Sequence, residues 1–328
     1  MSGKIRIGVI GAGAWGTALA QCAAANGDGV MLWAHEADVA EAINAGRENT
    51  IYLPGVPLSP SITATTEVGD LAEASALLVV VPAQHLRGVL SRIQVGDRPL
   101  VLCAKGIEAG TGLLMSQVAA AVHPGAPIAV LSGPTFAHEV ARGLPTAVTL
   151  ACDSMPVARA IAGRIARPAF RPYLSDDVIG AEIGGAVKNV LAIACGVVDG
   201  AGLGQNARAA LIARGFAEMS RFGMALGARG ETLAGLSGLG DLVLTCSSTA
   251  SRNFSLGKGL GEGRSAQSLL ADRRTVAEGA FTAPVLRDVA RRARVEMPVV
   301  EAVCALLDGS RSIDETIAGL LSRPLRSE

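Results

Sequence analysis

The sequence lacks net charge and long apolar runs. Lys plus Arg and Asp plus Glu both total 29, so the formal net charge is zero, and no long basic stretch occurs. Surfaces that bind nucleic acid carry clustered basic residues, so we do not expect nucleic acid as a partner. No uninterrupted apolar stretch approaches the roughly 18 to 20 residues that span a bilayer, and the run at 5–10 is too short for a signal-peptide core. These absences predict a cytoplasmic protein without a membrane span.

The cysteines form no local pair. All six lie tens of residues from one another, so neither a CxxC redox pair nor a zinc knuckle can form within one segment. We therefore predict buried, reduced thiols and no metal site.

Lysine is scarce, with four residues against a far larger number of arginines. Lys105 and Lys188 nevertheless lie in apolar segments, where a solubilising lysine is not expected. Burial can lower the pKa of a lysine enough for proton transfer at neutral pH, which arginine cannot match. Both are candidates for chemistry, although a lysine stem can also cross an apolar surface and leave its amine in water.

The length of 328 residues favours two domains, at 1–178 and 179–328. In the first, strand-like segments alternate with helical ones, which predicts an α/β fold with a Rossmann-like, doubly wound parallel sheet. From about residue 177 the strand signals fade, so we expect an all-α C-terminal domain. Strands are predicted at 5–10, 30–34, 76–81, 99–104, 128–131 and 147–151, and helices at 17–25, 113–122, 179–198, 207–222, 282–292 and 299–307.

A glycine-rich turn follows the first strand and precedes the first helix. Gly11, Gly13 and Gly16 let the backbone approach a pyrophosphate, whose charge the amides at the helix N-terminus would bind. His35 follows the second strand, where NAD enzymes place the acid that binds the ribose, and Glu36 comes next. NADP(H) or NAD(H) both fit this pattern, and His35 could also be an exposed loop residue.

Two further segments lie at the expected carboxyl ends of strands, where ligands bind to such sheets. One holds Lys105 and the other is the turn 132–135. In the second domain, Lys188 shares one face of its helix with very small residues, which would permit close approach of another helix or a ligand. These residues are Gly180, Gly184, Gly185 and Ala192.

Asp241 follows a glycine-rich loop, and either caps a helix or holds a nearby ammonium. The segment 247–253 is rich in hydroxyl and amide groups around Arg252. It is interpreted as a loop for a phosphorylated ligand, because arginine binds phosphate oxygens in pairs. A merely polar surface loop is the alternative.

Eight segments in this order resemble the bacterial, soluble NAD(P)-dependent glycerol-3-phosphate dehydrogenases, over about residues 5–320. They are GAGAWGTALA, NTIYLPG, AKGIE, SGPTFAHEV, VKN, GLSGLGDL, SRNF and VAEG. The resemblance implies reversible reduction of dihydroxyacetone phosphate to sn-glycerol 3-phosphate for phospholipid synthesis. It makes Lys188 the proton donor and acceptor, assisted by Lys105 and Asp241.

The resemblance also implies a set of binding residues. The substrate would contact Lys105, Gly133, Thr135, Lys188, Asn189, Asp241, Ser251, Arg252 and Asn253. The cofactor would contact the turn Gly11, Gly13, Ala14, Trp15 and Gly16, with His35, Lys105, Ala137, Arg252, Val276 and Glu278. Ala14 stands where many relatives carry serine, so a hydroxyl contact is lost there.

Two other functions are compatible with parts of this sequence. A β-hydroxyacid dehydrogenase also places a lysine and an asparagine on a glycine-rich helix, and a non-catalytic NAD(P)-sensing protein could use the same scaffold. The segments SRNF and GLSGLGDL favour the triose phosphate. A homodimer is expected, whereas cofactor preference and feedback regulation are not determined by the sequence.

Overall fold

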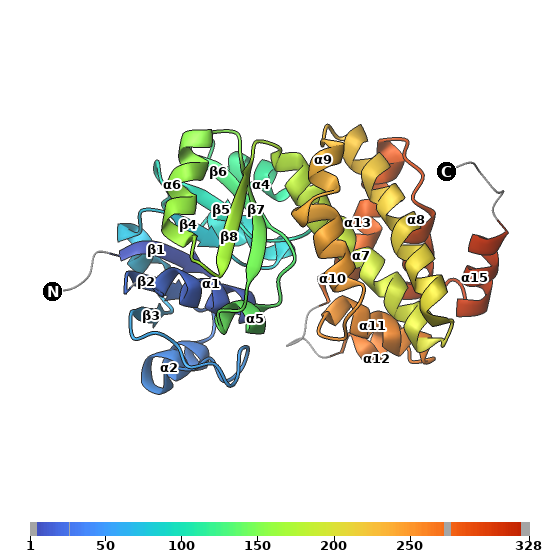
Figure 1. The fold of residues 1–328 in the computed structure, drawn as a ribbon, viewed down its shortest axis with the longest axis horizontal. Coiled ribbons are helices and arrows are strands. Elements are labelled where there is room, and N and C mark those ends of the chain that lie inside the picture. The colour runs from blue at the N-terminus through green and yellow to red at the C-terminus, as the bar shows by residue number, and fades with distance from the viewer. Residues whose placement is uncertain (1–4, 26, 272–276, 323–328) are drawn as a thin grey trace. The chain divides into compact units, whose positions relative to one another are not determined.

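The computed structural model describes residues 5–25, 27–271 and 277–322 (Figure 1). The chain forms two compact units. The first comprises Met1–Lys105 with Leu113–Glu182, and the second comprises Gly106–Gly112 with Ile183–Glu328.

The first unit contains an eight-stranded sheet in the order β3-β2-β1-β4-β5-β6-β7-β8. All neighbouring strands are parallel except β6 and β7. The chain moves outward from β1 first in one direction and then in the other, which confirms the predicted doubly wound, mostly parallel sheet. The strands are β1 (Ile5–Ile10), β2 (Gly29–Trp33), β3 (Ile62–Thr65), β4 (Leu77–Val79), β5 (Leu100–Leu102), β6 (Ile128–Ser132), β7 (Thr146–Cys152) and β8 (Phe170–Ser175).

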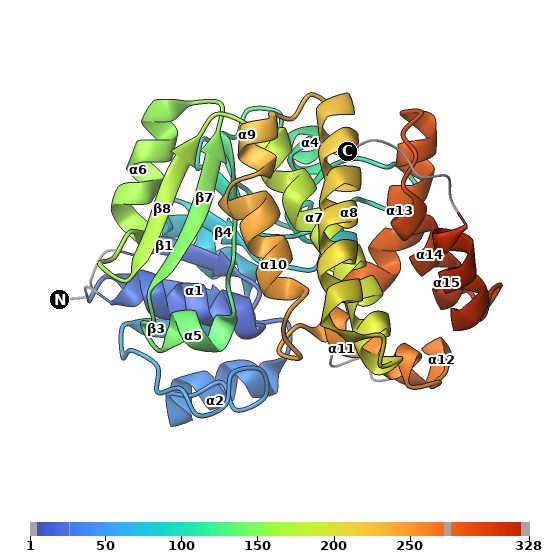
Figure 2. The same ribbon diagram turned by 45° about the vertical axis from the view of Figure 1, so that its right-hand side comes forward.

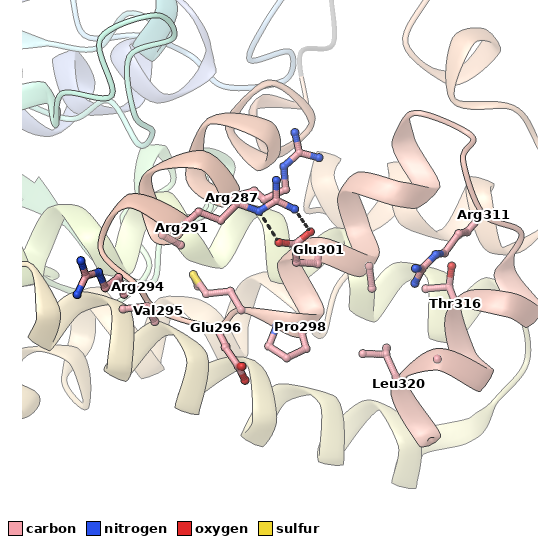
Figure 3. Close-up of a pocket in the computed structure, with 14 residues that line it drawn as sticks. Arg287, Arg291, Arg294, Val295, Glu296, Pro298, Glu301, Arg311, Thr316 and Leu320 are labelled. Carbon is pink, nitrogen blue, oxygen red and sulfur yellow. Dashed lines mark hydrogen bonds and ion pairs between the residues drawn. The ribbon is translucent and has the colours of Figure 1, made fainter. Parts of the chain in front are cut away.

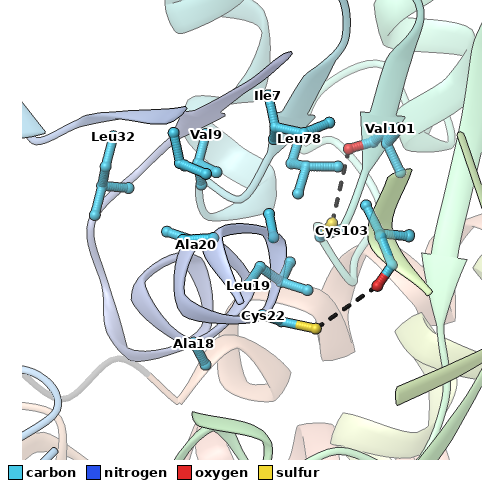
Figure 4. Packing of buried hydrophobic residues seen from close by; sticks show 14 of the residues in the cluster. Ile7, Val9, Ala18, Leu19, Ala20, Cys22, Leu32, Leu78, Val101 and Cys103 are labelled. Carbon is cyan, nitrogen blue, oxygen red and sulfur yellow. Dashed lines mark hydrogen bonds between the residues drawn. The ribbon is translucent and has the colours of Figure 1, made fainter. Parts of the chain in front are cut away.

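Alternate side chains of the central strands point to opposite faces of the sheet, and both sets are apolar and buried. Helices therefore cover both faces. Val9, Leu78 and Val101 belong to one apolar cluster, which includes Leu19 of α1. Ile10, the residue after Val9 in β1, belongs to another cluster. Figure 4 shows α1 packed on the first of these faces. The helices are α1 (Ala14–Ala24), α2 (Ala37–Gly46), α3 (Leu86–Leu90), α4 (Met115–Val122), α5 (Ala137–Ala141) and α6 (Met155–Ile165), with 3-10 turns η1 (Val68–Glu73) and η2 (Ala83–His85).

The described part of the second unit is helical and contains no strand, which confirms the predicted all-α region (Figure 2). Each of the four helices expected there is present, with ends that differ by a few residues. The elements are α7 (Val178–Gly200), of which residues 183–200 belong to this unit, α8 (Gly204–Ala225), α9 (Gly230–Leu233), the π-helical η3 (Leu236–Gly240), α10 (Asp241–Thr245), α11 (Arg252–Gly261), α12 (Ala266–Leu269), α13 (Glu278–Arg292), α14 (Pro298–Leu307) and α15 (Ile313–Leu321).

Glycines let α7 pack directly on neighbouring backbone. A Cβ on Gly196 would lie 2.1 Å from the Phe254 carbonyl oxygen, and one on Gly200 would lie 2.1 Å from that of Lys258. Both partners belong to α11, so no side chain separates the two helices. By length and composition α7 could cross a membrane, with a mean hydropathy of 1.5, yet 89% of that window is buried inside the protein. Burial of this extent is typical of a core helix.

The thiols are buried, as predicted. All six cysteines are free and buried. Burial raises the pKa of Cys103 to about 12 and that of Cys22 to about 11, so these thiols stay protonated and unreactive at neutral pH.

Candidate active site

The glycine turn between β1 and α1 has the shape that a pyrophosphate requires. Gly11 has φ +110°, and a Cβ on Gly16 would lie 1.8 Å from the Gly11 carbonyl oxygen. A Cβ on Gly13 would meet no atom within 4 Å, and Gly13, the N-cap of α1, has no side chain that could cover the amides. The first amides of α1 are therefore approachable, and the cradle fits a dinucleotide.

Helix α1 begins three residues before the predicted Thr17. Ala14, Trp15 and Gly16 consequently form its first turn instead of the loop. Sequence reasoning assigned no role to Asn49, whose buried amide donates to the Ala12 carbonyl at 2.8 Å and holds the turn in place.

The second strand ends where the cofactor ribose is expected. His35 follows β2 and is exposed, and its ring centroid lies 6.1 Å from that of Trp33. The Glu36 carboxylate accepts a 3.1 Å hydrogen bond from the Tyr52 hydroxyl. No carboxylate occupies the His35 position itself, which is compatible with either cofactor.

Three predicted residues of the first unit lie together. Lys105 Nζ and Thr135 Oγ1 each donate to the Gly133 carbonyl oxygen, both at 3.3 Å. Gly133 has φ +155°, and a Cβ there would lie 2.9 Å from Val148 Cα, so only glycine fits this strand end. Ala137 begins α5, which contacts α1.

The second unit contains an ion pair on facing helices. Lys188 Nζ donates to Asp241 Oδ1 at 2.6 Å and to Thr245 Oγ1 at 2.9 Å. Thr245 in turn donates to the Asp241 carbonyl oxygen at 2.6 Å. The N-cap interpretation of Asp241 is wrong, because Gly240 caps α10 and the carboxylate binds the ammonium. Thr245 was missed, although its spacing of four residues from Asp241 places both on one helical face.

A second polar group surrounds the start of α11. The Asn253 amide donates to Asn189 Oδ1 at 3.0 Å and accepts from the Gly279 amide at 2.9 Å. The predicted loop 247–253 ends earlier than expected: Ser251 is the N-cap and accepts from the Phe254 amide at 3.2 Å. Arg252 and Asn253 are thus the first residues of a helix, and the exposed Arg252 stands at its positive end.

Of the two cofactor-binding residues predicted near α13, only one lies among the described residues. Glu278 is the first residue of that helix, next to the Gly279 amide that binds Asn253. Val276 lies outside the described residues.

A pocket of about 470 Å³ lies elsewhere in the second unit, lined by α13, α14 and α15 (Figure 3). Two of its lining residues form an ion pair: the Arg291 guanidinium donates to both carboxylate oxygens of Glu301, at 2.9 and 3.0 Å. None of the predicted site residues that the structure describes lines this pocket. Among residues 5–25, 27–271 and 277–322, no group of three or more His, Cys, Asp or Glu side chains could hold a metal ion.

Known proteins resemble the chain over nearly its whole length. The sequence model of the N-terminal part of NAD-dependent glycerol-3-phosphate dehydrogenase matches residues 6–158, and that of the C-terminal part matches residues 177–318. A glycerol-3-phosphate dehydrogenase [NAD(P)+] of Novosphingobium aromaticivorans is 65% identical, with 98% of each chain covered. The glycerol-3-phosphate dehydrogenase [NAD(P)+] 1 of Sphingopyxis alaskensis is 60% identical, with 100% of this chain and 99% of the other covered.

The fold agrees with a solved structure. The crystal structure of glycerol-3-phosphate dehydrogenase from Coxiella burnetii superposes with a TM-score of 0.93 at 38% identity, covering 98% of this chain and 99% of the other. On these sequence and structural similarities, the chain belongs to the NAD-dependent glycerol-3-phosphate dehydrogenase family.

Proposed function

We propose that the chain catalyses the reversible NAD(P)H-dependent reduction of dihydroxyacetone phosphate to sn-glycerol 3-phosphate, which supplies phospholipid synthesis. The observation that carries the proposal is the buried pair of Lys188 and Asp241, in the same unit as the helix start that presents Arg252. A positioned proton donor and a phosphate-binding cation are what a phosphorylated ketone requires.

The cofactor would be held by the cradle of the first unit. Gly11, Gly13 and Gly16 bring the backbone close to the pyrophosphate, and the amides of Ala14 and Trp15 begin α1. The remaining proposed contacts are His35, Lys105, Ala137, Arg252, Val276 and Glu278. When bound, the reduced nicotinamide supplies a hydride to the carbonyl carbon of the substrate.

Lys188 is the proposed general acid and base. Its ammonium stabilises the negative charge that develops on the carbonyl oxygen and donates a proton to it; in the reverse direction the amine accepts that proton. Asp241 and Thr245 hold Nζ through bonds of 2.6 and 2.9 Å, so its position is set before the substrate arrives. Lys105 adds positive potential.

Phosphate recognition is assigned to the start of α11. The Arg252 guanidinium can bind two phosphate oxygens, and the helix N-terminus favours the same charge. Asn253, fixed by Asn189 and Gly279, is a third donor in this region. Gly133, Thr135 and Ser251 are the remaining proposed substrate contacts.

The proposal is tested by the initial rate of dihydroxyacetone phosphate reduction, followed through nicotinamide absorbance with NADH and NADPH in parallel. Short β-hydroxy acids serve as competing substrates for the oxidation direction. Turnover of the triose phosphate is expected with at least one cofactor. Cofactor binding without turnover would favour the sensing protein instead, and turnover of β-hydroxy acids alone would favour the other dehydrogenase.

The proposal includes residues 1–178 as the cofactor domain, residues 179–328 as the substrate domain, a cytoplasmic location and a homodimer. Light scattering on the purified chain measures the oligomeric state directly.

A further inference from the structure

One glycine on the helical face of Lys188 contacts the segment that leads into Asp241. Gly184 lies one turn before Lys188 in α7. A Cβ on Gly184 would lie 2.3 Å from the Ser237 carbonyl oxygen and 2.8 Å from Gly238 Cα. These contacts join backbone to backbone, so no flexible side chain could move aside to accept a methyl group.

The contacted segment also packs tightly against the end of α9. It is the π-helical turn η3, in which the Gly240 amide donates to the Gly235 carbonyl at 3.0 Å. A Cβ on Gly238 would lie 1.9 Å from the Leu233 carbonyl oxygen. The wide turn is therefore fixed between the backbone of α7 and the end of α9. π-helical turns are rare and often occur at functional sites.

Asp241 follows η3 directly, so the position of this turn determines where the carboxylate lies. From the Gly184–Ser237 contact, four residues along α7 lead to Lys188, and four residues along the facing segment lead to Asp241. We infer that Gly184 is a positioning residue of the proposed active site: its missing side chain sets the 2.6 Å distance between Lys188 Nζ and Asp241 Oδ1. This inference rests on the proposed function.

A methyl group at position 184 would force Ser237 to move by about 1 Å before ordinary contact is restored. Asp241 would move with it. A displacement of about 1 Å within a catalytic group can lower turnover about 100-fold. We therefore expect Gly184→Ala to lower kcat by between about 10- and 100-fold, with the Kd for NADPH within twofold of the wild type.

Two matched glycines distinguish positioning from general damage. Gly196→Ala introduces a clash of similar size in the same helix, at 2.1 Å, but against α11. It should raise the KM for dihydroxyacetone phosphate more than it lowers kcat, because Arg252 and Asn253 begin that helix. Gly215→Ala meets only the tip of the Leu191 side chain, at 2.8 Å, and should leave both constants unchanged.

A milder variant covers the case in which Gly184→Ala does not fold. Gly235 begins the π-helical turn, and a Cβ there would lie 3.3 Å from two carbonyl oxygens, a contact that a small shift relieves. Gly235→Ala should lower kcat a few-fold, again with NADPH binding unchanged. A longer carboxylate can compensate for a displaced backbone. Asp241→Glu alone should lower kcat, but combined with Gly184→Ala or Gly235→Ala it should restore part of the kcat that the glycine substitution loses.

The outcomes distinguish an error in the proposed function from an error in the positioning role of Gly184. If the wild-type chain does not reduce dihydroxyacetone phosphate, the proposed function is wrong. If it does, and Gly184→Ala or Gly235→Ala keeps the wild-type kcat, or changes kcat and KM as Gly196→Ala does, the positioning role alone is wrong. Absence of rescue by Asp241→Glu would likewise count against it.

Discussion

Lys188 and Asp241 form an ion pair almost completely removed from solvent, with 8% and 0% of their side chains exposed. Removing water from two charges is costly, and the short hydrogen bond with its additional Thr245 partner offsets that cost. Taking away either residue alone leaves a buried charge without its counter-ion. The same pair therefore affects stability and, in the proposed mechanism, proton transfer.

Lys188→Ala should lower kcat by about 100- to 10,000-fold, the usual contribution of positioned acid catalysis. Binding of NADPH should survive, since the glycine cradle is untouched. The variant should also lose about 3 to 5 kcal/mol of stability, because Asp241 stays buried. Kinetics and thermal unfolding measure the two effects. Lys258→Ala, which removes a partly exposed lysine paired with Asp199, is the control and should change neither strongly.

Arg252→Ala should raise the KM for dihydroxyacetone phosphate by about 100-fold, since a pair of charge-assisted hydrogen bonds contributes a few kcal/mol. Its effect on unphosphorylated dihydroxyacetone should be far smaller. Arg291→Ala removes an arginine of the α13–α15 pocket and serves as the matched control. An equal loss with and without the phosphate would contradict the assigned role.

The cofactor preference should depend on His35. His35→Asp introduces a carboxylate that can accept hydrogen bonds from the ribose but repels a 2′-phosphate. We expect the ratio of kcat/KM with NADPH to that with NADH to fall about tenfold or more, as one lost or repelled charge contact costs at least about 1.4 kcal/mol. Parallel rates with both cofactors measure this ratio, and an unchanged value would place His35 outside the ribose site.

Glu182 should make stability depend on pH. Burial raises the pKa of its carboxyl group from 4.5 to about 7, and hydrogen bonds from Ser116 at 2.6 and 2.7 Å only partly oppose that effect. Between these values the folded state keeps a proton that the unfolded state releases. The contribution of this carboxyl group to stability is therefore greatest below about pH 4.5 and falls as pH rises to about 7, by up to about 3 kcal/mol.

Glu182→Gln should remove that slope, because a glutamine amide stays neutral and can still bond to Ser116. Urea unfolding at a series of pH values measures the effect, with Glu301→Gln as an exposed control. The variant should exceed the wild type in stability near pH 8 and match it near pH 4. A difference that stays constant across this range would show that the Glu182 carboxyl is not responsible.

Much of the first unit could be predicted because its signals are local. Apolar runs and the glycine turn identify six of the strands and the cofactor cradle. The missed strands β3 and β8 lie at the two edges of the sheet, where pairing on one side leaves a weak pattern. Strand β8 also contains Pro172, which argues against a central strand but is tolerated at an edge.

The second unit contains features that local sequence signals do not determine. Gly257, Gly259 and Gly261 lie in the later turns of α11 and lower its intrinsic helix propensity, and the hydroxyl- and amide-rich residues 247–253 before it predict a loop. Contacts with α7 stabilise that helix despite its composition. Likewise, Lys188 and Asp241 are 53 residues apart, and only packing reveals their bond. The ordered motifs indicated both residues, whereas Thr245 became visible only in the structure.

The backbone contacts of α7 also restrict how this sequence can change over time. Where two side chains are in contact, the neighbour can accommodate a substitution by changing its rotamer, so many substitutions at such positions are neutral. At Gly184, Gly196 and Gly200, an added Cβ would lie only 2.1 to 2.3 Å from a backbone carbonyl oxygen. Even alanine would therefore require the backbone to move at these positions. Homologues should therefore vary around this helix while these positions stay glycine, and directed evolution aimed at new substrates should fail there first.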